Sequence, residues 1–320
     1  MAHSWWKRKV RTRPLSGCPW GAEYIRLVEY FTRAGLTFDV TDSGPTDGEV
    51  IILLHGWPQD RHAFDRLIPL LTAAGYRALA FDQRGYSPGA QPKPLAAYAM
   101  AELVEDVIAL ADAVPAERVH LVGHDWGGAV AWAVAERFPD KLASLTVLST
   151  PHPRAMAAAW QHPEQLAKSW YMLAFQAPVL PELVLRSTLG IVLRRSGLDA
   201  EDADGYAARF RRPGRASGGL AWYRAMGLSE VKHLGKSLRR NATTDSGGDS
   251  LITVPTTFVW GNQDVALGRH AATETARWVS GDYRFVELEA GHWLPETRPH
   301  DVASAILHRT RGERAPRGNG

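Results

Sequence analysis

Residues 119–128 have the sequence Val119-His-Leu-Val-Gly-His-Asp-Trp-Gly-Gly128, and this stretch decides the fold of the 320-residue chain. An apolar run typical of a buried strand ends at Gly123, and a helical pattern begins directly after Asp125. Glycines two residues before and two residues after Asp125 permit a turn so tight that its side chain stands exposed above a sheet. The spacing therefore predicts a nucleophile elbow that presents Asp125. The alternative is a helix-capping aspartate, but a cap needs no glycines at these two positions.

Short β-branched runs alternate with helical patterns on both sides of this stretch. The expected strands are residues 36–40, 50–54, 78–81, 119–122, 145–148, 256–260 and 285–288. The expected helices are residues 64–74, 101–114, 127–138, 271–279 and 302–307. This alternation predicts an α/β fold, with a mostly parallel sheet flanked by helices on both faces.

The alternation stops between residues 151 and 244, where strand-like runs are absent and prolines separate helical pieces. We expect an inserted helical cap over residues 151–244, on a core formed by residues 23–150 and 245–320. The polar, glycine-rich stretch 241–249 is the expected linker back into the sheet. Residues 1–22 form a basic N-terminal extension outside the core.

The formal net charge of +3 is concentrated in the two ends of the chain. Residues 1–13 contribute +5 and residues 309–320 contribute +3, which leaves residues 14–308 at −5. A folded part with this balance argues against nucleic-acid binding. No apolar run is long enough for a membrane span, and no secretory signal is recognisable, so we expect a cytoplasmic protein. A single cysteine, Cys18, excludes an internal disulfide and a cysteine-based metal site.

A carboxylate nucleophile at the elbow, in place of a serine, predicts a different class of reaction. It is anionic at neutral pH and can displace a leaving group from an sp3 carbon, which gives an ester that must then be hydrolysed. Hydrolysis needs a base for water and an acid that orients this base. Asp264 follows the strand 256–260 and His292 follows the strand 285–288. The chain order Asp125, Asp264, His292 is that of the α/β-hydrolase triad.

The developing oxyanion needs two backbone donors. One is expected to be the N–H of Trp126, directly after the nucleophile. The loop His55-Gly-Trp-Pro58 follows the strand 50–54, and its Gly56 permits close backbone approach, so the N–H of Trp57 is the expected second donor. A cis Trp57–Pro58 bond would aim this N–H. An ordinary turn is the alternative interpretation of the loop.

Five motifs, HGWPQ (55–59), DQRGYS (82–87), GHDWGG (123–128), WGNQD (260–264) and GHW (291–293), occur in this order. From about residue 30 to 310 the chain resembles the epoxide hydrolases of the α/β-hydrolase superfamily. The resemblance implies two cap tyrosines that hold the epoxide oxygen, and the segments 169–178 and 219–224 place them at Tyr171 and Tyr223. It implies a small apolar epoxide and water as substrates, without metal or organic cofactor. The substrate pocket is expected to include His55, Gly56, Pro58 and Trp293.

Three alternatives share the fold. Haloalkane dehalogenases hold a halide with a tryptophan after the nucleophile, which Trp126 provides, and often with an asparagine where this chain has Trp57. Fluoroacetate dehalogenases need arginines one and four residues after the nucleophile, where this chain has Trp126 and Ala129. A non-catalytic ligand-binding protein would not need a competent residue at every chemical position. Tyr206, Trp132 and Trp278 are interpreted as packing residues, and the oligomeric state stays open.

Overall fold

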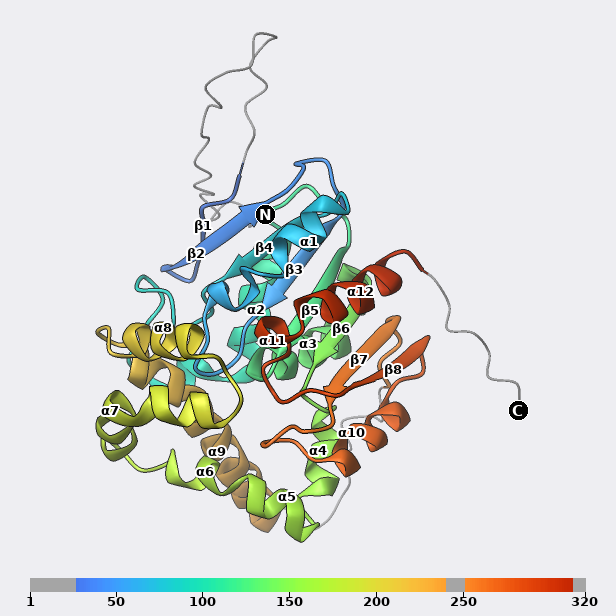
Figure 1. Cartoon of the computed structure of the whole chain (residues 1–320). Coiled ribbons are helices and arrows are strands. Elements are labelled where there is room, and N and C mark those ends of the chain that lie inside the picture. Colours follow the sequence, from blue (N-terminus) through green and yellow to red (C-terminus); the bar gives the residue numbers. More distant parts are fainter. Residues whose placement is uncertain (1–26, 240–250, 313–320) are drawn as a thin grey trace.

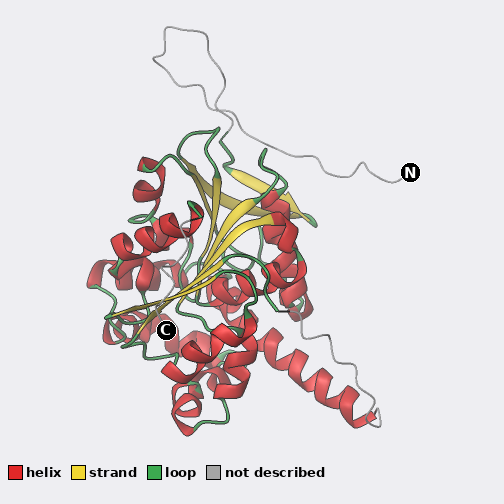
Figure 2. Cartoon of the chain, turned by 90° about the vertical axis from the view of Figure 1, so that its right-hand side faces the viewer, coloured by secondary structure: helices red, strands yellow, loops and turns green. Residues whose placement is uncertain are grey.

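A computed structural model describes residues 27–239 and 251–312 of the chain (Figure 1). Eight strands form one sheet in the order β1-β2-β4-β3-β5-β6-β7-β8. The strands β3 to β8 are parallel to one another, whereas β2 pairs antiparallel with β1 and β4. This sheet, with helices on both sides, confirms the predicted α/β fold class (Figure 2).

The strands are β1 (Tyr30–Arg33), β2 (Leu36–Ser43), β3 (Val50–Leu54), β4 (Arg77–Phe81), β5 (Val119–His124), β6 (Leu142–Leu148), β7 (Thr256–Gly261) and β8 (Tyr283–Leu288). The helices are α1 (Ile68–Ala73), α2 (Met100–Ala111), α3 (Trp126–Arg137), α4 (Pro153–Ala159), α5 (Pro163–Lys168), α6 (Trp170–Ala174), α7 (Leu180–Arg195), α8 (Ala200–Phe210), α9 (Arg215–Arg239), α10 (Arg269–Glu274), α11 (Leu294–Thr297) and α12 (Pro299–Thr310).

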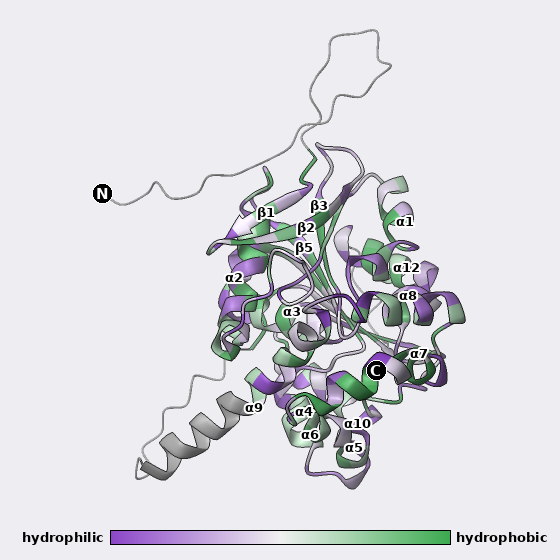
Figure 3. Cartoon of the chain, turned by 90° about the vertical axis from the view of Figure 1, so that its left-hand side faces the viewer, coloured by the Kyte–Doolittle hydropathy of each residue, from purple (hydrophilic) through white to green (hydrophobic). Residues whose placement is uncertain are grey.

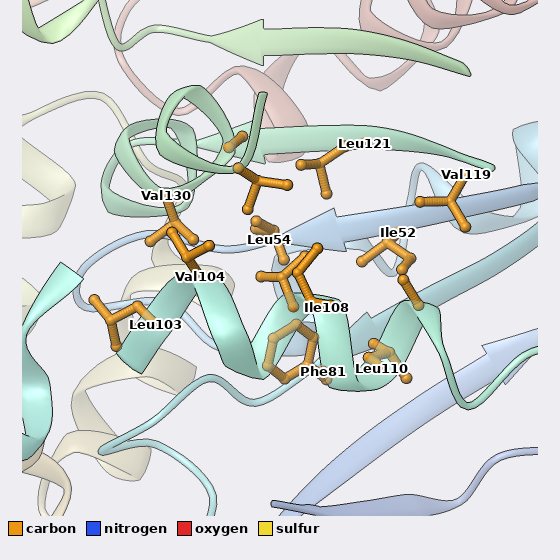
Figure 4. Packing of buried hydrophobic residues seen from close by; sticks show 14 of the residues in the cluster. Ile52, Leu54, Phe81, Leu103, Val104, Ile108, Leu110, Val119, Leu121 and Val130 are labelled. Atoms are coloured by element: carbon orange, nitrogen blue, oxygen red, sulfur yellow. The ribbon is translucent and has the colours of Figure 1, made fainter. Parts of the chain in front are cut away.

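The core lies on both faces of the sheet, because alternate residues of each strand point to opposite faces. In β3, Ile52 and Leu54 contact the cluster built by α2 and α3 (Figure 4), whereas Ile51 and Leu53 contact the cluster that includes α1 and α12. All five residues of β3 are buried. Each fully buried aliphatic side chain stabilises the fold by roughly 1.5–3 kcal/mol. Burial on both faces explains why the central strands are continuous apolar runs.

The structure differs from the expected elements most clearly in one added strand and in the bounds of two helices. The strand β1 was not expected. It is four residues long and pairs with β2 across a turn in which Ala34 and Gly35 both have positive φ. The expected helix 64–74 begins only at Ile68, because residues 61–64 form a 3₁₀ turn. The expected helix 271–279 ends at Glu274 and continues as a 3₁₀ turn.

Six helices, α4 to α9, follow β6 and precede β7, and we call them the inserted helices. Two buried ion pairs fix them to the loop after β3, because Asp60 Oδ2 lies 2.6 Å from Arg209 Nε and 2.7 Å from Arg215 Nη2. In the described ranges, no helix is long and apolar enough to cross a membrane. The expected extension 1–22 and linker 241–249 lie outside the described residues.

Candidate active site

Asp125 lies at the turn between β5 and α3, as the glycine spacing predicts. Its φ of 51° and ψ of −122° are unusual for a residue with a side chain and cost on the order of 1–3 kcal/mol. A Cβ on Gly123 would lie 2.3 Å from the Gly127 carbonyl oxygen, and one on Gly127 would lie 2.2 Å from that of Leu54. Both glycines are therefore required by the turn. The Asp125 side chain makes no capping hydrogen bond to α3, which removes the helix-cap interpretation.

One oxygen of the Asp125 carboxylate is held by the loop after β3. The N–H of Trp57 donates to Oδ1 at 2.6 Å, and the N–H of Trp126 also bonds to the carboxylate. A Cβ on Gly56 would lie 2.3 Å from this Oδ1, so glycine allows the loop to approach so closely. The Trp57–Pro58 bond is cis, as expected. The two predicted oxyanion donors thus face the same carboxylate.

The other oxygen of this carboxylate faces His292. The distance from Asp125 Oδ2 to His292 Nε2 is 3.6 Å. On the far side of the ring, Nδ1 lies 2.8 Å from Asp264 Oδ2. The second oxygen of Asp264 accepts from the N–H groups of Ala266 at 2.8 Å and Leu267 at 3.0 Å, so this carboxylate is fixed in place. The structure brings all three predicted triad residues together.

The charges of Asp125, His292 and Asp264 stabilise one another. Burial would lower the pKa of His292, but the carboxylates of Asp264 and Asp125 outweigh burial and raise this pKa to about 10. Burial would raise the pKa of Asp125, but hydrogen bonding and charge from His292 hold it below its ordinary value. At neutral pH the site therefore contains an anionic Asp125 beside a protonated His292.

The raised pKa of His292 predicts a pH-dependent stability. In the unfolded chain a histidine titrates near 6.5. Its stabilising contribution is complete below about pH 6.5 and is lost as the pH rises to about 10, because only the native state keeps the proton in this range. The free energy of unfolding in urea is to be compared between the wild type and His292→Gln from pH 7 to 9. Its decrease with pH in the wild type should exceed that in His292→Gln by up to about 1.4 kcal/mol per pH unit. Parallel losses in the two proteins would contradict this pKa.

Asp125 and His292 open into a cavity of about 470 Å³ between the sheet and the inserted helices. Tyr171 of α6 and Tyr223 of α9 line the same cavity, and their ring centroids are 6.1 Å apart. Burial raises the pKa of both phenols, so both are neutral hydrogen-bond donors. A hydrogen bond from the side chain of Trp126 opposes this rise at Tyr223. The structure thus places both predicted tyrosines above the predicted nucleophile.

The predicted pocket residues divide into two groups. Trp293 lines the cavity, as does Trp57. His55, Gly56 and Pro58 are not among the residues that line this cavity, so their place in the substrate pocket stays a prediction. The His55 ring is turned into the core, where Nδ1 lies 2.9 Å from the Gly56 carbonyl and Nε2 accepts from the Gln83 N–H at 3.1 Å. These three residues shape the loop behind the cavity wall.

A buried polar network behind the triad was missed by the sequence analysis. Gln59 Oε1 accepts from the Gly56 N–H at 2.9 Å and lies 2.8 Å from His124 Nδ1. Its Nε2 donates to Glu296 Oε1 at 2.6 Å, and Tyr206 of α8 donates to the same oxygen at 2.7 Å. Burial raises the pKa of Glu296 to about 7, against the effect of these donors. The network joins α8 to the loop that holds Asp125.

Comparisons with known proteins relate this chain to one fold family and to named relatives. The chain matches the alpha/beta hydrolase fold family over residues 49–299. An AB hydrolase superfamily protein of Bacillus subtilis is 33% identical over 288 residues, which cover 87% of this chain and 96% of that protein. Epoxide hydrolase A of Mycobacterium tuberculosis is 32% identical over 90% of this chain and 97% of its own length. The crystal structure of epoxide hydrolase A from Mycobacterium thermoresistibile has a TM-score of 0.73 at 28% identity, covering 88% of this chain and 97% of that one.

Proposed function

Because this chain belongs to the α/β-hydrolase fold family, in the branch of the epoxide hydrolases, we propose that it hydrolyses epoxides to vicinal diols through a covalent ester on Asp125. The observation that carries the proposal is that Asp125, the half-buried Tyr171 and the buried Tyr223 line one cavity. A strained ether leaves as an alkoxide, which a phenol can hydrogen-bond and protonate. A halide leaving group needs no proton.

In the first half of the reaction, Asp125 attacks an epoxide carbon. Oδ1 is engaged by the Trp57 N–H, so Oδ2 is the oxygen that forms the new bond. The carbon–oxygen bond of the ring breaks, and a tyrosine delivers a proton to the alkoxide. Esterification removes the charge of Asp125, one of the two carboxylates that raise the pKa of His292. The imidazolium then releases a proton, which balances the one given to the alkoxide.

In the second half, neutral His292 takes a proton from water, and the water oxygen attacks Cγ of Asp125. Oδ1 becomes the oxyanion between the N–H groups of Trp57 and Trp126. When the Cγ–Oδ2 bond breaks, the leaving alkoxide takes the second proton of that water. This step regenerates anionic Asp125 and protonated His292. Asp264 acts through His292, because its carboxylate fixes the ring and balances its charge.

The division of the chain into units is part of the same proposal. Residues 23–150 and 245–320 would form the catalytic core, and residues 151–244 would form a cap that supplies the tyrosines. Four contacts of the inserted helices support this division: the two ion pairs of Asp60, the Tyr206–Glu296 hydrogen bond and the bond from Trp222 Nε1 to the Arg84 carbonyl at 2.8 Å.

Haloalkane dehalogenase remains the second candidate, because one observation favours it. The indole Nε1 of Trp57 is buried and has no hydrogen-bond partner in the described part of the chain, so it could donate to a halide. The indole of Trp126, in contrast, packs edge-to-face against Tyr223, with the ring centroids 5.0 Å apart.

Intact-protein mass spectrometry distinguishes the two candidates. The protein is mixed rapidly with an aryl epoxide or with a chloroalkane, and the reaction is quenched in acid. An adduct equal in mass to the whole epoxide supports the proposal. An adduct only with the chloroalkane, formed with loss of chloride, would replace it with the dehalogenase.

The two tyrosines should affect only the first half of the reaction. Tyr171→Phe and Tyr223→Phe are each expected to slow ester formation by about 10²–10³-fold, by analogy with the loss of one oxyanion donor. Ester hydrolysis should keep its rate, because the phenols bond only to the leaving oxygen. Rapid-quench measurement of both steps checks this, with Tyr206→Phe as a control outside the cavity. An unchanged rate of ester formation in both variants would mean that the two tyrosines only pack in the cavity wall.

A further inference from the structure

The helix α7 has apolar residues on two opposite faces. Pro181, Leu185, Leu189 and Leu193 are buried against the rest of the protein. On the other side, Leu180, Leu183, Val184 and Ile191 are exposed, and Val192, beside the buried face, is exposed as well. A surface helix of a globular protein normally presents charged and polar side chains to water. The outer face of α7 therefore has the composition of a surface that contacts an apolar phase.

The apolar surface extends beyond α7. Nine of the eleven exposed large hydrophobic side chains in the described residues lie between residues 166 and 192, on or beside α5, α6 and α7. Figure 3 shows where these helices lie and the hydropathy of their residues. On α6, Trp170 is 68% exposed and Leu173 is 80% exposed. We call these nine residues the outer apolar patch; they are Leu166, Trp170, Leu173, Val179, Leu180, Leu183, Val184, Ile191 and Val192. Clusters of this kind mark interaction surfaces, whereas isolated exposed leucines do not.

The patch overlaps the wall of the catalytic cavity. Trp170, Leu180, Val184 and Val192 belong to the patch and also line the cavity that contains Asp125. Part of the patch is therefore also cavity wall, so a surface that covers the patch lies beside the catalytic cavity.

The charges around the patch are mainly positive. Two exposed arginines on α7, Arg186 and Arg195, form no ion pair within the described residues, whereas the exposed Arg194 is paired with Asp204 of α8. The single acidic residue of α7, Glu182, is paired with Arg224 at 2.7 Å. Arg211 adds another exposed cation next to α7, because its Nη1 lies 3.5 Å from the Arg186 carbonyl. Apolar residues flanked by arginines fit an anionic lipid surface.

We propose that the outer apolar patch docks on the surface of an anionic lipid bilayer, so that apolar epoxides enter the cavity directly from the lipid. A second copy of the chain fits this surface less well. A symmetric contact between two copies would bring the arginines of one patch near those of the other, and it would also cover the cavity mouth. A bilayer satisfies both the apolar patch and the charges. Docking extends the proposed function, but it is measured by binding and does not depend on turnover.

Vesicle co-sedimentation of the full chain tests the proposal. The probes are phosphatidylcholine vesicles with and without phosphatidylglycerol. Leu173→Asn, Leu183→Asn and Ile191→Asn change patch residues that do not line the cavity, and Leu251→Asn is the matched control at an exposed leucine outside the patch. We expect binding to the anionic vesicles, weakened about tenfold or more by each patch variant, since each removes a buried aliphatic contact with lipid. Arg195→Gln should weaken it about fivefold.

Each outcome decides the matter. Turnover of a water-soluble epoxide should stay at the wild-type rate in all five variants, which separates docking from catalysis and shows that the variants fold. The proposal is overturned if neither vesicle type binds the protein, or if Leu251→Asn weakens binding as much as the patch variants. It is also overturned if size-exclusion chromatography shows a dimer that the patch variants dissociate while vesicles do not bind. That result would assign the patch to a second copy.

Discussion

Replacement of His292 with Gln is expected to stop turnover while the ester on Asp125 still forms. An anionic carboxylate needs no base to attack, so the histidine is required only once the ester exists. The rate of turnover should fall by at least about four orders of magnitude, as for the loss of other catalytic bases. Mass spectrometry should then show a stable increase equal to one whole epoxide. In a serine hydrolase, the same change would block the first step instead.

Asp264→Asn should show the same defect in a weaker form. The imidazole remains, but it loses the partner 2.8 Å from Nδ1 and the charge that supports its proton. We expect the same adduct, with slow residual hydrolysis. If His292→Gln forms no adduct and does not turn over, although circular dichroism shows it folded, then the histidine acts before or during ester formation. The two-step assignment would then be wrong.

Asp125→Ala should abolish ring opening and prevent any adduct. No other carboxylate lines the cavity in the described residues, so nothing there can replace this nucleophile. We expect the epoxide-opening rate to fall to the background rate in water, a loss of about 10⁶-fold by analogy with other covalent nucleophiles. The measurement is diol formation by chromatography, with circular dichroism as the folding control. Residual opening near the wild-type rate would mean that water attacks the epoxide directly.

The elbow and the triad could be predicted because their geometry depends on local sequence. Gly123 and Gly127 have neighbours within 2.3 Å of an added Cβ, so only glycine fits, and such a requirement is visible in a single sequence. Asp264 and His292 each follow an apolar strand, and parallel strands bring their carboxyl ends to one edge of the sheet. The resemblance to epoxide hydrolases then indicated the tyrosines.

The parts that could not be predicted depend on contacts between distant segments. Glu296 accepts hydrogen bonds from Tyr206 of an inserted helix and from Gln59 of the loop after β3. No local sequence pattern predicts these contacts. His55 was placed in the pocket because it belongs to a motif, but its ring direction is set by Gln83, 28 residues away. The composition of α7 was visible as apolar, whereas its exposure depends on which of its faces the core occupies.

The central claim is that Asp125 forms a covalent ester, and the most direct measurement is a single turnover in ¹⁸O-labelled water with enzyme in excess. The oxygen that enters the diol should come from the Asp125 carboxylate, so the first diol is expected to be unlabelled. The label should be found in the enzyme, on the peptide that contains Asp125. A diol that carries solvent oxygen on the first turnover, with no label in this peptide, would contradict the covalent mechanism.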